Sequence, residues 1–453
     1  MPIIESISGI RGTVNDGSLN KENVYQYVTN YSQKILKGKN KKVVLGYDGR
    51  ASGKWIMNVA SRAFVDNGVS VIDIGLCTTP TIAYYSLLKH ASGALMVSAS
   101  HNPKEWNGLK FFGNTGEIIE KKFLPLLLKN TKIPKGTKKG VYKKDTKALS
   151  LHIKKIISQK EIDIKSIKQK NYRILVDGIN ASGSVALPVM LKTLGVKKVD
   201  VINAQVGKSF THKPEPLKEN LTNTIKKMKA GKYDIGVVVD PDADRLLLIG
   251  KDGFWLGEEM TQVLASRAVL LRSKDSKKLI VTNLSSSRSF EDMGKMYKAK
   301  TIYSSVGTVN VIKTMKKHKA LIGGEGNGGV IWPKVHYERD SLTGVSLILS
   351  YISQKNISLS EAVSDIPRYY FLKEKIELKK QISLDKLIST LKKTEKKAKI
   401  NTTDGVKLDF PDYWIHIRKS NTEPIMRIYI ESANKQKATA VFNKYKKLIN
   451  SLV

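Results

Sequence analysis

The chain has 453 residues, of which 41% are hydrophobic and 26% are charged. This length exceeds what one hydrophobic core usually supports, so we expect two to four domains. Lys and Arg number 78 against 40 Asp and Glu, a formal net charge of +38. Such a charge is typical of proteins that bind nucleic acid or anionic membranes, but a soluble enzyme with a lysine-rich surface is equally compatible with it.

The kind of basic residue favours the enzyme. Lysine greatly outnumbers arginine, and the lysines are scattered from one end of the chain to the other. Base recognition and bidentate phosphate contacts prefer arginine. We therefore expect no specific nucleic-acid partner, and the positive field would at most attract a small anionic substrate.

Targeting signals and disulfides are not expected. Cys77 is the single cysteine, so no intramolecular disulfide can form, which fits a reducing compartment. The opening MPIIESISGIRG lacks the pattern of a signal peptide, and the apolar stretch 345–352 is too short to span a bilayer. We expect that stretch to be a buried helix, and the protein to be cytoplasmic, without a membrane partner, as a monomer or homodimer.

Strand and helix patterns alternate from the start of the chain. The first unit is predicted to contain strands over 42–47, 69–74 and 94–98 and helices over 55–66 and 79–89. This order predicts a mostly parallel sheet that is covered by helices on both faces. The segment 131–145, rich in Lys, Gly and Pro, interrupts the alternation and is predicted to be a linker or excursion.

The alternation restarts twice, which predicts two more α/β units of similar size. Predicted strands cover 172–177, 199–202, 233–239, 279–282, 301–304 and 320–322, and predicted helices cover 185–194 and 309–317, with another after Arg288. The last part differs, with strands over 369–378, 414–418 and 426–431 and helices over 384–393 and 435–452. Strands beside helices without strict alternation predict a smaller α+β domain, with a hinge near Pro367.

The predicted fold is therefore α/β, with three similar domains on mixed, mostly parallel sheets and a smaller C-terminal α+β domain. The predicted boundaries are 1–142, 143–250, 251–365 and 366–453.

The first motif is Ser98-Ala99-Ser100-His101-Asn102-Pro103, which follows an apolar strand. Open α/β sheets bind ligands at the carboxyl ends of their strands, so this position suits a reactive group. The Ser100 hydroxyl could accept a phosphoryl group, with His101 or a nearby base assisting. Taken alone, the same residues are also compatible with an ordinary polar turn closed by proline.

The second motif, Asp240-Pro241-Asp242-Ala243-Asp244-Arg245, also follows an apolar strand. Three carboxylates at alternate positions can converge on one hard cation, and oxygen ligands favour Mg²⁺ over Zn²⁺. The alternative is an acidic turn in water. The apolar flanks VVVD and LLLI disfavour it, because unpaired carboxylates beside them would repel one another without a cation.

The third motif is the glycine-rich segment 323–329, GGEGNGG, which happens to match GxGxxG. A dinucleotide fingerprint must open a helix, and the following Val330-Ile331-Trp332-Pro333 does not. A tight loop that presents Glu325 and Asn327 to vicinal hydroxyls is the better interpretation, and a purely structural turn is the alternative.

The fourth motif is Arg418-Lys419-Ser420-Asn421-Thr422-Glu423-Pro424, with Arg427 close behind. Two guanidinium groups, two hydroxyls, an amide and free backbone N–H groups suit a phosphate, although a polar hairpin is also compatible. The chain has no GxxxxGK[ST], so it offers no support for a nucleoside triphosphate site of that type.

In this order and spacing, the four motifs resemble the α-D-phosphohexomutase superfamily, which includes phosphoglucomutases, phosphomannomutases and phosphoglucosamine mutases. The resemblance covers essentially the whole chain, including Ser8-Gly9-Ile10-Arg11-Gly12 and Tyr47-Asp48-Gly49-Arg50. It implies a four-domain, heart-shaped enzyme that interconverts hexose 6-phosphate and hexose 1-phosphate. The reaction would use a phosphoserine, one Mg²⁺ per chain, and a hexose 1,6-bisphosphate as intermediate and activator.

The resemblance also implies a role for each matching residue. Ser100 would carry the phosphoryl group and bind Mg²⁺ together with Asp240, Asp242 and Asp244. The other catalytic residues would be Arg11, His101, Lys110 and Arg245, of which Arg11 and Lys110 would stabilise charge and assist proton transfer. The substrate-binding residues would be Gly307, Thr308, Glu325, Asn327, Arg418, Ser420, Asn421, Thr422 and Arg427, the last five holding the phosphate that is not transferred.

The sequence departs from some relatives in two loops. Several relatives have Ser and then His where this chain has Asn327 and Gly329, so an acid–base role of that His is absent here. Asn421 stands where the common bacterial phosphoglucosamine mutases have Gly. Glucosamine phosphate is the predicted substrate, because its product is a cell-wall precursor that even a minimal cell needs, and mannose or glucose phosphate is the alternative. A basic nucleic-acid-binding protein and a non-catalytic family member are the other hypotheses; the intact Ser100 and aspartates argue against the latter.

Overall fold

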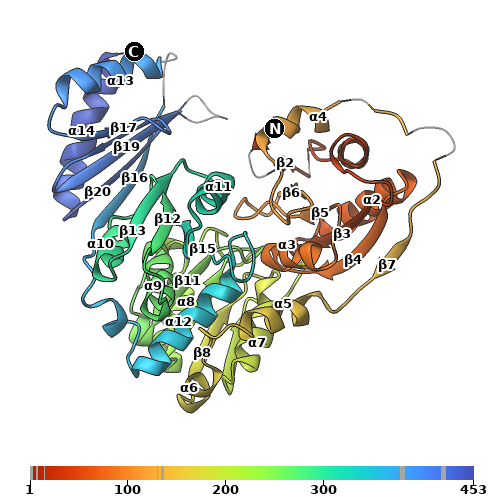
Figure 1. Ribbon diagram of the computed structural model, residues 1–453, viewed down its shortest axis with the longest axis horizontal. Helices are drawn as coiled ribbons and strands as arrows, with labels where there is room; N and C mark the ends of the chain where they lie inside the picture. The colour runs from red at the N-terminus through yellow and green to blue at the C-terminus, as the bar shows by residue number, and fades with distance from the viewer. Residues whose placement is uncertain are drawn as a thin grey trace.

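The structure, a computed structural model, describes residues 4–6, 9–14, 16–129, 131–133, 137–377, 383–419 and 425–452. Its strands form four sheets, which follow one another along an arc in chain order, with domain I at the right of Figure 1 and domain IV at the upper left. No helix within these ranges combines the length and hydropathy needed to cross a membrane.

Domain I is built on a mixed sheet in the order β1-β2-β6-β5-β3-β4-β7. Its strands are β1 (Ile4–Ser6), β2 (Gly9–Thr13), β3 (Lys42–Tyr47), β4 (Ser70–Leu76), β5 (Gly93–Val97), β6 (Trp106–Phe112) and β7 (Tyr142–Lys144). Its helical segments are α1 (Lys21–Asn30), η1 (Tyr31–Ile35), α2 (Gly53–Asp66), α3 (Thr79–Leu88), η2 (Lys121–Phe123) and α4 (Leu124–Leu127). Val43 and Leu45 enter one core with α1 and α2, whereas Val44 enters another with α3, so helices cover both faces as predicted.

Strand β7 corrects one prediction. The prediction for 131–145 is a linker or excursion, yet Tyr142–Lys144 pairs in parallel with β4 and extends the sheet of domain I. All three residues are exposed, so no alternation of buried and polar positions marked them as a strand. Backbone hydrogen bonding to an existing edge decided the conformation instead.

Domains II and III have closely similar sheets, in the orders β11-β10-β8-β9 and β13-β12-β14-β15. Their strands are β8 (Arg173–Asp177), β9 (Lys198–Ile202), β10 (Ile235–Val239), β11 (Leu246–Gly250), β12 (Leu279–Asn283), β13 (Lys300–Ser304), β14 (Ile322–Glu325) and β15 (Gly329–Ile331). In each sheet three strands are parallel, and β11 or β15 is an antiparallel edge strand.

The helices of these two domains pack into one large hydrophobic core, which extends from Ile153 to Ile366, and into two smaller cores around Met228 and Met315. They are α5 (Ala148–Ile157), α6 (Ile164–Gln169), α7 (Gly183–Thr193), α8 (Thr222–Gly231), α9 (Glu258–Arg272), α10 (Ser289–Met296), α11 (Thr308–His318) and α12 (Ser341–Lys355), with short 3₁₀ turns η3 (Lys218–Asn220), η4 (Lys251–Gly253) and η5 (Glu361–Val363). Helix α12 contacts α5, α6 and α7 of domain II as well as α9 of domain III. It is buried from Ser341 to Ser353, which confirms the predicted buried helix over 345–352.

Domain IV is a five-stranded antiparallel sheet in the order β16-β20-β19-β18-β17. Its strands are β16 (Tyr370–Glu377), β17 (Lys399–Asn401), β18 (Val406–Asp409), β19 (Tyr413–Lys419) and β20 (Ile425–Ser432), and its helices are α13 (Leu384–Thr394) and α14 (Lys435–Ser451). The helices lie on one face of the sheet (Figure 1) and close a separate core around Leu391 and Tyr445. The predicted fold class, three α/β domains followed by a smaller α+β domain, is confirmed.

We predict that Gly93→Ala destabilises domain I. Gly93 opens β5, and a Cβ there would lie 2.0 Å from Tyr31 Oη and 2.6 Å from the Phe112 carbonyl oxygen. Tyr31 is fully buried and cannot move without disturbing the core, so we expect the free energy of unfolding to fall by about 1–3 kcal/mol. Chemical denaturation measures this change.

Gly113→Ala is the matched control. Its Cβ would meet nothing closer than 3.9 Å, so the change in unfolding free energy should stay within about 1 kcal/mol. Equal losses for the two variants would contradict the packing argument.

Candidate active site

The first three motifs each lie on a loop at the carboxyl end of a strand. The serine loop (98–103) follows β5, the acidic loop (240–245) joins β10 to β11, and the glycine loop (326–328) joins β14 to β15. Each loop follows an inner strand of its sheet, the position where open α/β sheets place their ligands.

The serine loop holds Ser100 in an unusual conformation. Ser100 has φ of 50°, in the left-handed region, which costs a residue with a Cβ about 1–2 kcal/mol. Its backbone N–H donates to Ser98 Oγ at 2.9 Å, and its hydroxyl donates to Asp240 Oδ2 at 2.9 Å. The strained turn therefore aims the hydroxyl directly at the acidic loop.

The acidic loop buries three carboxylates on one tight turn. Asp240, Asp242 and Asp244 are at most 1% exposed, and one oxygen of each lies within 4.8 Å of the others. The turn closes through the Ala243 N–H, which donates to the Asp240 carbonyl at 2.9 Å, with Ala243 also in the left-handed region.

Cations from all three α/β domains neutralise this turn. Lys110 of β6 in domain I places its Nζ 2.5 Å from Asp242 Oδ2 and 3.4 Å from Asp244 Oδ2. Arg339 of domain III donates to Asp244 Oδ2 at 2.5 Å. Arg245 of the loop itself places its Nε 3.9 Å from Asp240 Oδ2. Buried carboxylates need such partners, because an isolated buried charge is strongly unfavourable.

The pKa values of Asp240, Asp242 and Lys110 are shifted in different directions by their surroundings. Burial, reinforced by the charges of Asp244 and Asp242, raises the pKa of Asp240 well above its usual value. Burial also opposes ionisation of Asp242, but the adjacent Lys110 outweighs it and lowers the pKa of that carboxyl. For Lys110, burial disfavours the charged form, but Asp242 and Asp244 outweigh it and raise the pKa of the ammonium group. At neutral pH Lys110 is therefore a fixed positive charge.

The acidic loop has the donor set of a hard divalent cation. Asp242 Oδ1 and Asp244 Oδ1 are buried and have no hydrogen-bond partner among the described residues. Two such oxygens beside the Asp240 carboxylate and the Ser100 hydroxyl fit Mg²⁺, which prefers oxygen ligands.

A second buried cluster, formed by His152, His336 and Asp340, lies where α3, α5 and α12 meet. The two imidazole Nε2 atoms lie 3.2 and 3.3 Å from the same oxygen of Asp340. Asp340 thus has two imidazole partners, and His152 Nδ1 also lies 3.1 Å from Thr81 Oγ1, so we regard the cluster as structural.

His101 lies beside the Ser100 hydroxyl, and Arg11 contacts the serine loop. Arg245 Nη2 donates to His101 Nδ1 at 2.9 Å, and this Nδ1 lies 3.4 Å from Ser100 Oγ. The Arg245 charge, together with burial, lowers the pKa of His101 well below its usual value, so the imidazole is neutral at neutral pH. Arg11 donates to Asn102 Oδ1 at 2.6 Å, and burial lowers the pKa of its guanidinium to about 10.

Glu325 organises the neighbouring part of domain III. Its Oε1 accepts from the Gly307 N–H and from Asn283 Nδ2, each at 3.1 Å. Its Oε2 accepts from Thr308 Oγ1 at 2.9 Å and from Arg339 Nη1 at 3.3 Å. Arg339 therefore links Glu325 to Asp244, so one guanidinium connects the third and second motifs.

Asn327 lies in the glycine loop, where its Oδ1 accepts from the Gly329 N–H at 3.3 Å. The loop is fixed to domain II because the Leu246 N–H donates to the Gly328 carbonyl at 3.0 Å. Gly328 has φ of 86°, and a Cβ there would lie 2.2 Å from the Leu246 carbonyl oxygen, so this close approach requires glycine.

The described residues of the fourth motif, Arg418, Lys419 and Arg427, lie on the strands of domain IV. Arg418 and Arg427 face each other across β19 and β20, and Arg418 Nε lies 3.0 Å from Asp404 Oδ1. Asp404 Oδ2 also accepts from the Val306 N–H at 2.8 Å, so it connects the Arg418 strand to the segment that leads to Gly307. The predicted binding residues Ser420, Asn421 and Thr422 lie outside the described residues.

Comparison with known proteins identifies the family. Four models of the phosphoglucomutase/phosphomannomutase family match in order: alpha/beta/alpha domain I over 4–132, domain II over 150–253, domain III over 257–370 and the C-terminal domain over 375–447. The chain belongs to this family. The predicted membership of the α-D-phosphohexomutase superfamily is thus confirmed, and the protein is an enzyme of the isomerase class.

Similar proteins cover nearly the whole chain. A phosphoglucosamine/phosphogalactosamine mutase of Sulfurisphaera tokodaii is 31% identical over 97% of this chain and 98% of its own. A phosphoglucomutase/phosphomannomutase of Thermococcus kodakarensis is 32% identical over 87% of each. Among solved structures, a phosphoglucomutase/phosphomannomutase family protein from Burkholderia thailandensis shares the fold, with a TM-score of 0.84 at 21% identity over 98% of this chain and 96% of its own.

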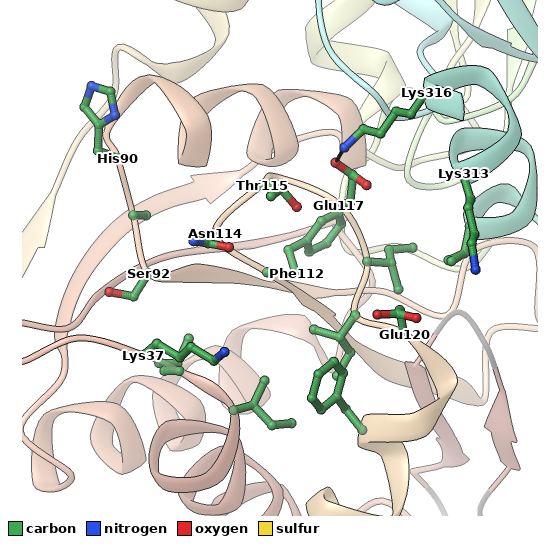
Figure 2. Close-up of a pocket in the computed structure, with 18 residues that line it drawn as sticks. Lys37, His90, Ser92, Phe112, Asn114, Thr115, Glu117, Glu120, Lys313 and Lys316 are labelled. Atoms are coloured by element: carbon green, nitrogen blue, oxygen red, sulfur yellow. Dashed lines mark hydrogen bonds and ion pairs between the residues drawn. The ribbon is translucent and has the colours of Figure 1, made fainter. Parts of the chain in front are cut away.

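This family member has one cavity beside the serine loop and another at the opposite end of the same strands. One of about 600 Å³ is adjacent to the serine loop and is lined by His101, Phe210, His212 and Glu215 among others. The other, of about 890 Å³, lies at the opposite end of β5 and β6, between domain I and α11. Figure 2 shows Lys316 of α11 reaching across it to Glu117. None of the predicted site residues within the described part of the chain lines the larger cavity.

Two further arginines contact the site although the sequence predicts no role for either of them. Arg339, which links Asp244 and Glu325, stands just before a buried helix and belongs to no recognisable motif. Arg50 was noted only as part of the resemblance, although it contacts the serine loop. Its position offered a signal, because β3 pairs in parallel with β5 and the two strands end at the same edge of the sheet.

We predict that Lys110→Met destabilises the metal-free protein. The change leaves Asp242 with no charged partner at hydrogen-bonding distance among the described residues, so we expect the free energy of unfolding to fall by about 3–5 kcal/mol. Denaturant titration in the presence of a chelator gives this value.

Lys122→Met provides the comparison, because Lys122 pairs with Glu120 at 2.7 Å but the two side chains are 65% and 55% exposed. That change should cost less than about 1 kcal/mol. If the two variants were equally stable, Lys110 would not be neutralising the acidic loop.

Proposed function

We propose that this family member interconverts glucosamine 6-phosphate and glucosamine 1-phosphate through a phosphorylated Ser100. The observation that carries the proposal is the 2.9 Å contact between the Ser100 hydroxyl and Asp240, inside a turn neutralised by cations from three domains. Phosphoryl transfer needs a positioned nucleophile and dense positive charge around the moving group, and both are present.

The proposed reaction has two transfers. Phospho-Ser100 gives its phosphoryl group to the free hydroxyl of a hexose monophosphate: the sugar O–P bond forms, the Ser100 O–P bond breaks, and the proton of the sugar hydroxyl is passed to the Ser100 oxygen, which yields a hexose 1,6-bisphosphate. After the bisphosphate turns around, Ser100 attacks the other phosphoryl group and the isomeric monophosphate is released. Each end of the sugar must therefore occupy both the reacting site and a remote phosphate site.

Mg²⁺ would be held by Asp240, Asp242, Asp244 and the Ser100 oxygen or its phosphate. The unpartnered oxygens Asp242 Oδ1 and Asp244 Oδ1 support this assignment. When bound, the cation would supply positive charge to the phosphoryl oxygens. Arg245, beside His101, would supply a further positive charge.

Proton exchange with the sugar hydroxyl falls to Arg11 in this proposal. The lowered pKa of Arg11, about 10, makes loss of a proton easier than for an ordinary guanidinium, whereas the raised pKa of Lys110 keeps that group charged. Lys110 would therefore act electrostatically.

Glu325 and Asn327 would bind sugar hydroxyls, next to Gly307 and Thr308, whose groups already surround the Glu325 carboxylate. Arg418 and Arg427, with Ser420, Asn421 and Thr422, would hold the phosphate that is not being transferred. Two arginines facing each other on neighbouring strands suit a phosphate whichever end of the sugar carries it.

The choice of glucosamine is supported by the printed name of the Sulfurisphaera relative, a phosphoglucosamine/phosphogalactosamine mutase. Mannose or glucose phosphate is the second candidate, supported by the Thermococcus phosphoglucomutase/phosphomannomutase. We further propose a cytoplasmic monomer or homodimer, consistent with the one cysteine, which is buried and free.

A substrate comparison tests the choice of sugar. With Mg²⁺ and a trace of hexose 1,6-bisphosphate, we expect kcat/KM to be highest for glucosamine 6-phosphate and activity to disappear on chelation and return with Mg²⁺. Comparable rates on mannose and glucose phosphates with little on glucosamine phosphate would move the assignment to the second candidate. Activity that survives chelation would contradict the metal role.

Ser100→Ala tests the phosphoenzyme. We expect turnover to fall by at least about 10⁴-fold, because the acceptor oxygen is lost, while the circular dichroism spectrum and melting temperature stay close to those of the wild type. Incubation with ³²P-labelled hexose 1,6-bisphosphate should label the wild type and leave the variant unlabelled. Ser158→Ala, at an exposed position on domain II, should label and turn over normally. A fully active Ser100→Ala enzyme would rule out the phosphoserine.

A further inference from the structure

We propose that Arg50 is the positioning residue of the nucleophile: it holds the serine loop in the one conformation that aims the Ser100 hydroxyl at the acidic loop. This inference rests on the proposed function of Ser100. Arg50 follows β3, the strand beside β5, and is only 3% exposed.

Arg50 contacts the serine loop entirely through main-chain oxygens. Its Nη2 donates to the carbonyls of Ser100 at 2.5 Å and Asn102 at 2.8 Å. Its Nη1 donates to the carbonyls of Pro103 at 2.8 Å and Trp106 at 3.0 Å. One guanidinium therefore ties together the whole turn from the nucleophile to the start of β6.

The guanidinium is itself rigidly held. Its Nε donates to Asp48 Oδ2 at 3.2 Å, while the Arg50 backbone N–H donates to Asp48 Oδ1 at 3.0 Å. An arginine side chain has five N–H donors, and these contacts provide an acceptor for every one. The ring of Phe210, from domain II, lies 4.8 Å from the guanidinium carbon and covers its face.

This arrangement explains how a serine stays in a left-handed conformation. Ser100 has φ of 50°, which a side chain with a Cβ does not favour, so the surrounding structure must impose it. Arg50 does so by fixing the carbonyl of Ser100 and the carbonyls that follow it, and it leaves the hydroxyl free. Because these contacts involve only main-chain atoms, they persist when Ser100 carries a phosphoryl group and when it does not.

Lysine cannot replace this residue. Its ammonium group is a single point with three donors, whereas the four carbonyls lie around a planar fork. The serine loop therefore depends on the planar, forked shape of the Arg50 guanidinium and not on its positive charge, which a lysine would also supply.

The test compares Arg50→Lys and Arg50→Ala with the wild type in the mutase assay. We expect kcat to fall by about 100-fold in both variants, since misplacing a reacting group by about 1 Å has an effect of that size, with KM within about threefold of the wild type. The rate of ³²P transfer from hexose 1,6-bisphosphate to Ser100 should fall in parallel. Guanidinium ion at millimolar concentration should raise the kcat of Arg50→Ala at least about tenfold, because it can occupy the space left by the arginine side chain.

Arg267→Ala is the matched control. Arg267 is also buried, and donates to Tyr297 Oη at 2.9 Å, to the Ala362 carbonyl at 2.9 Å and to Asp365, but it lies in the core of domain III away from the three loops. This variant should lose stability while kcat stays unchanged and guanidinium gives no gain.

The outcomes separate this inference from the proposed function. A wild type that neither turns over nor accepts ³²P would end the phosphoserine proposal. If the wild type is active and the folded Arg50 variants have a kcat within about threefold of the wild-type value, the role of Arg50 is overturned and the proposed function is not. If Arg50→Ala does not fold, Arg50→Lys decides: a normal kcat at a normal melting temperature overturns the inference, and a reduced kcat at unchanged KM supports it.

Discussion

The rest of this structure depends on the need to neutralise three carboxylates that are buried on one six-residue turn. Asp240, Asp242 and Asp244 are almost fully inaccessible, and moving even one such charge out of water costs several kcal/mol unless it is compensated. Domain II has too little positive charge at that turn, so compensation comes from Lys110 of domain I and Arg339 of domain III. The arrangement of the three α/β domains is thus the arrangement that brings those cations to the acidic loop.

The backbone conformation of two facing loops aims the serine hydroxyl at this cluster. Ser100 and Ala243 both adopt left-handed conformations, one in each of the facing loops, and the two turns place the hydroxyl 2.9 Å from Asp240. The supports differ: the acidic loop is closed by its own backbone, whereas the serine loop is tied down by Arg50. The glycine loop completes the surroundings through the Gly328 carbonyl, which accepts from the first residue of β11.

The site residues that belong to a local sequence motif could be predicted from the sequence. Ser100 and the three aspartates were found because each motif follows an apolar strand, and the structure brings them together. Arg339 could not be found in this way, because it stands 95 residues from the carboxylate that it contacts. Strand β7 was missed for a related reason, since its conformation depends on the edge of β4 and not on its own residues. The roles of Ser420, Asn421 and Thr422 stay predictions from the resemblance.

The distance in sequence between Asp244 and Arg339 has a consequence for synthesis of the chain. A ribosome delivers Asp244 95 residues before Arg339, and domains tend to fold as they emerge. Until then the acidic turn has Lys110 from the finished domain I but lacks its second external cation. Domains II and III also share one hydrophobic core, so domain II cannot complete that core before domain III is made. We therefore expect these two domains to reach their final packing together, late in synthesis, when Arg339 reaches the acidic loop.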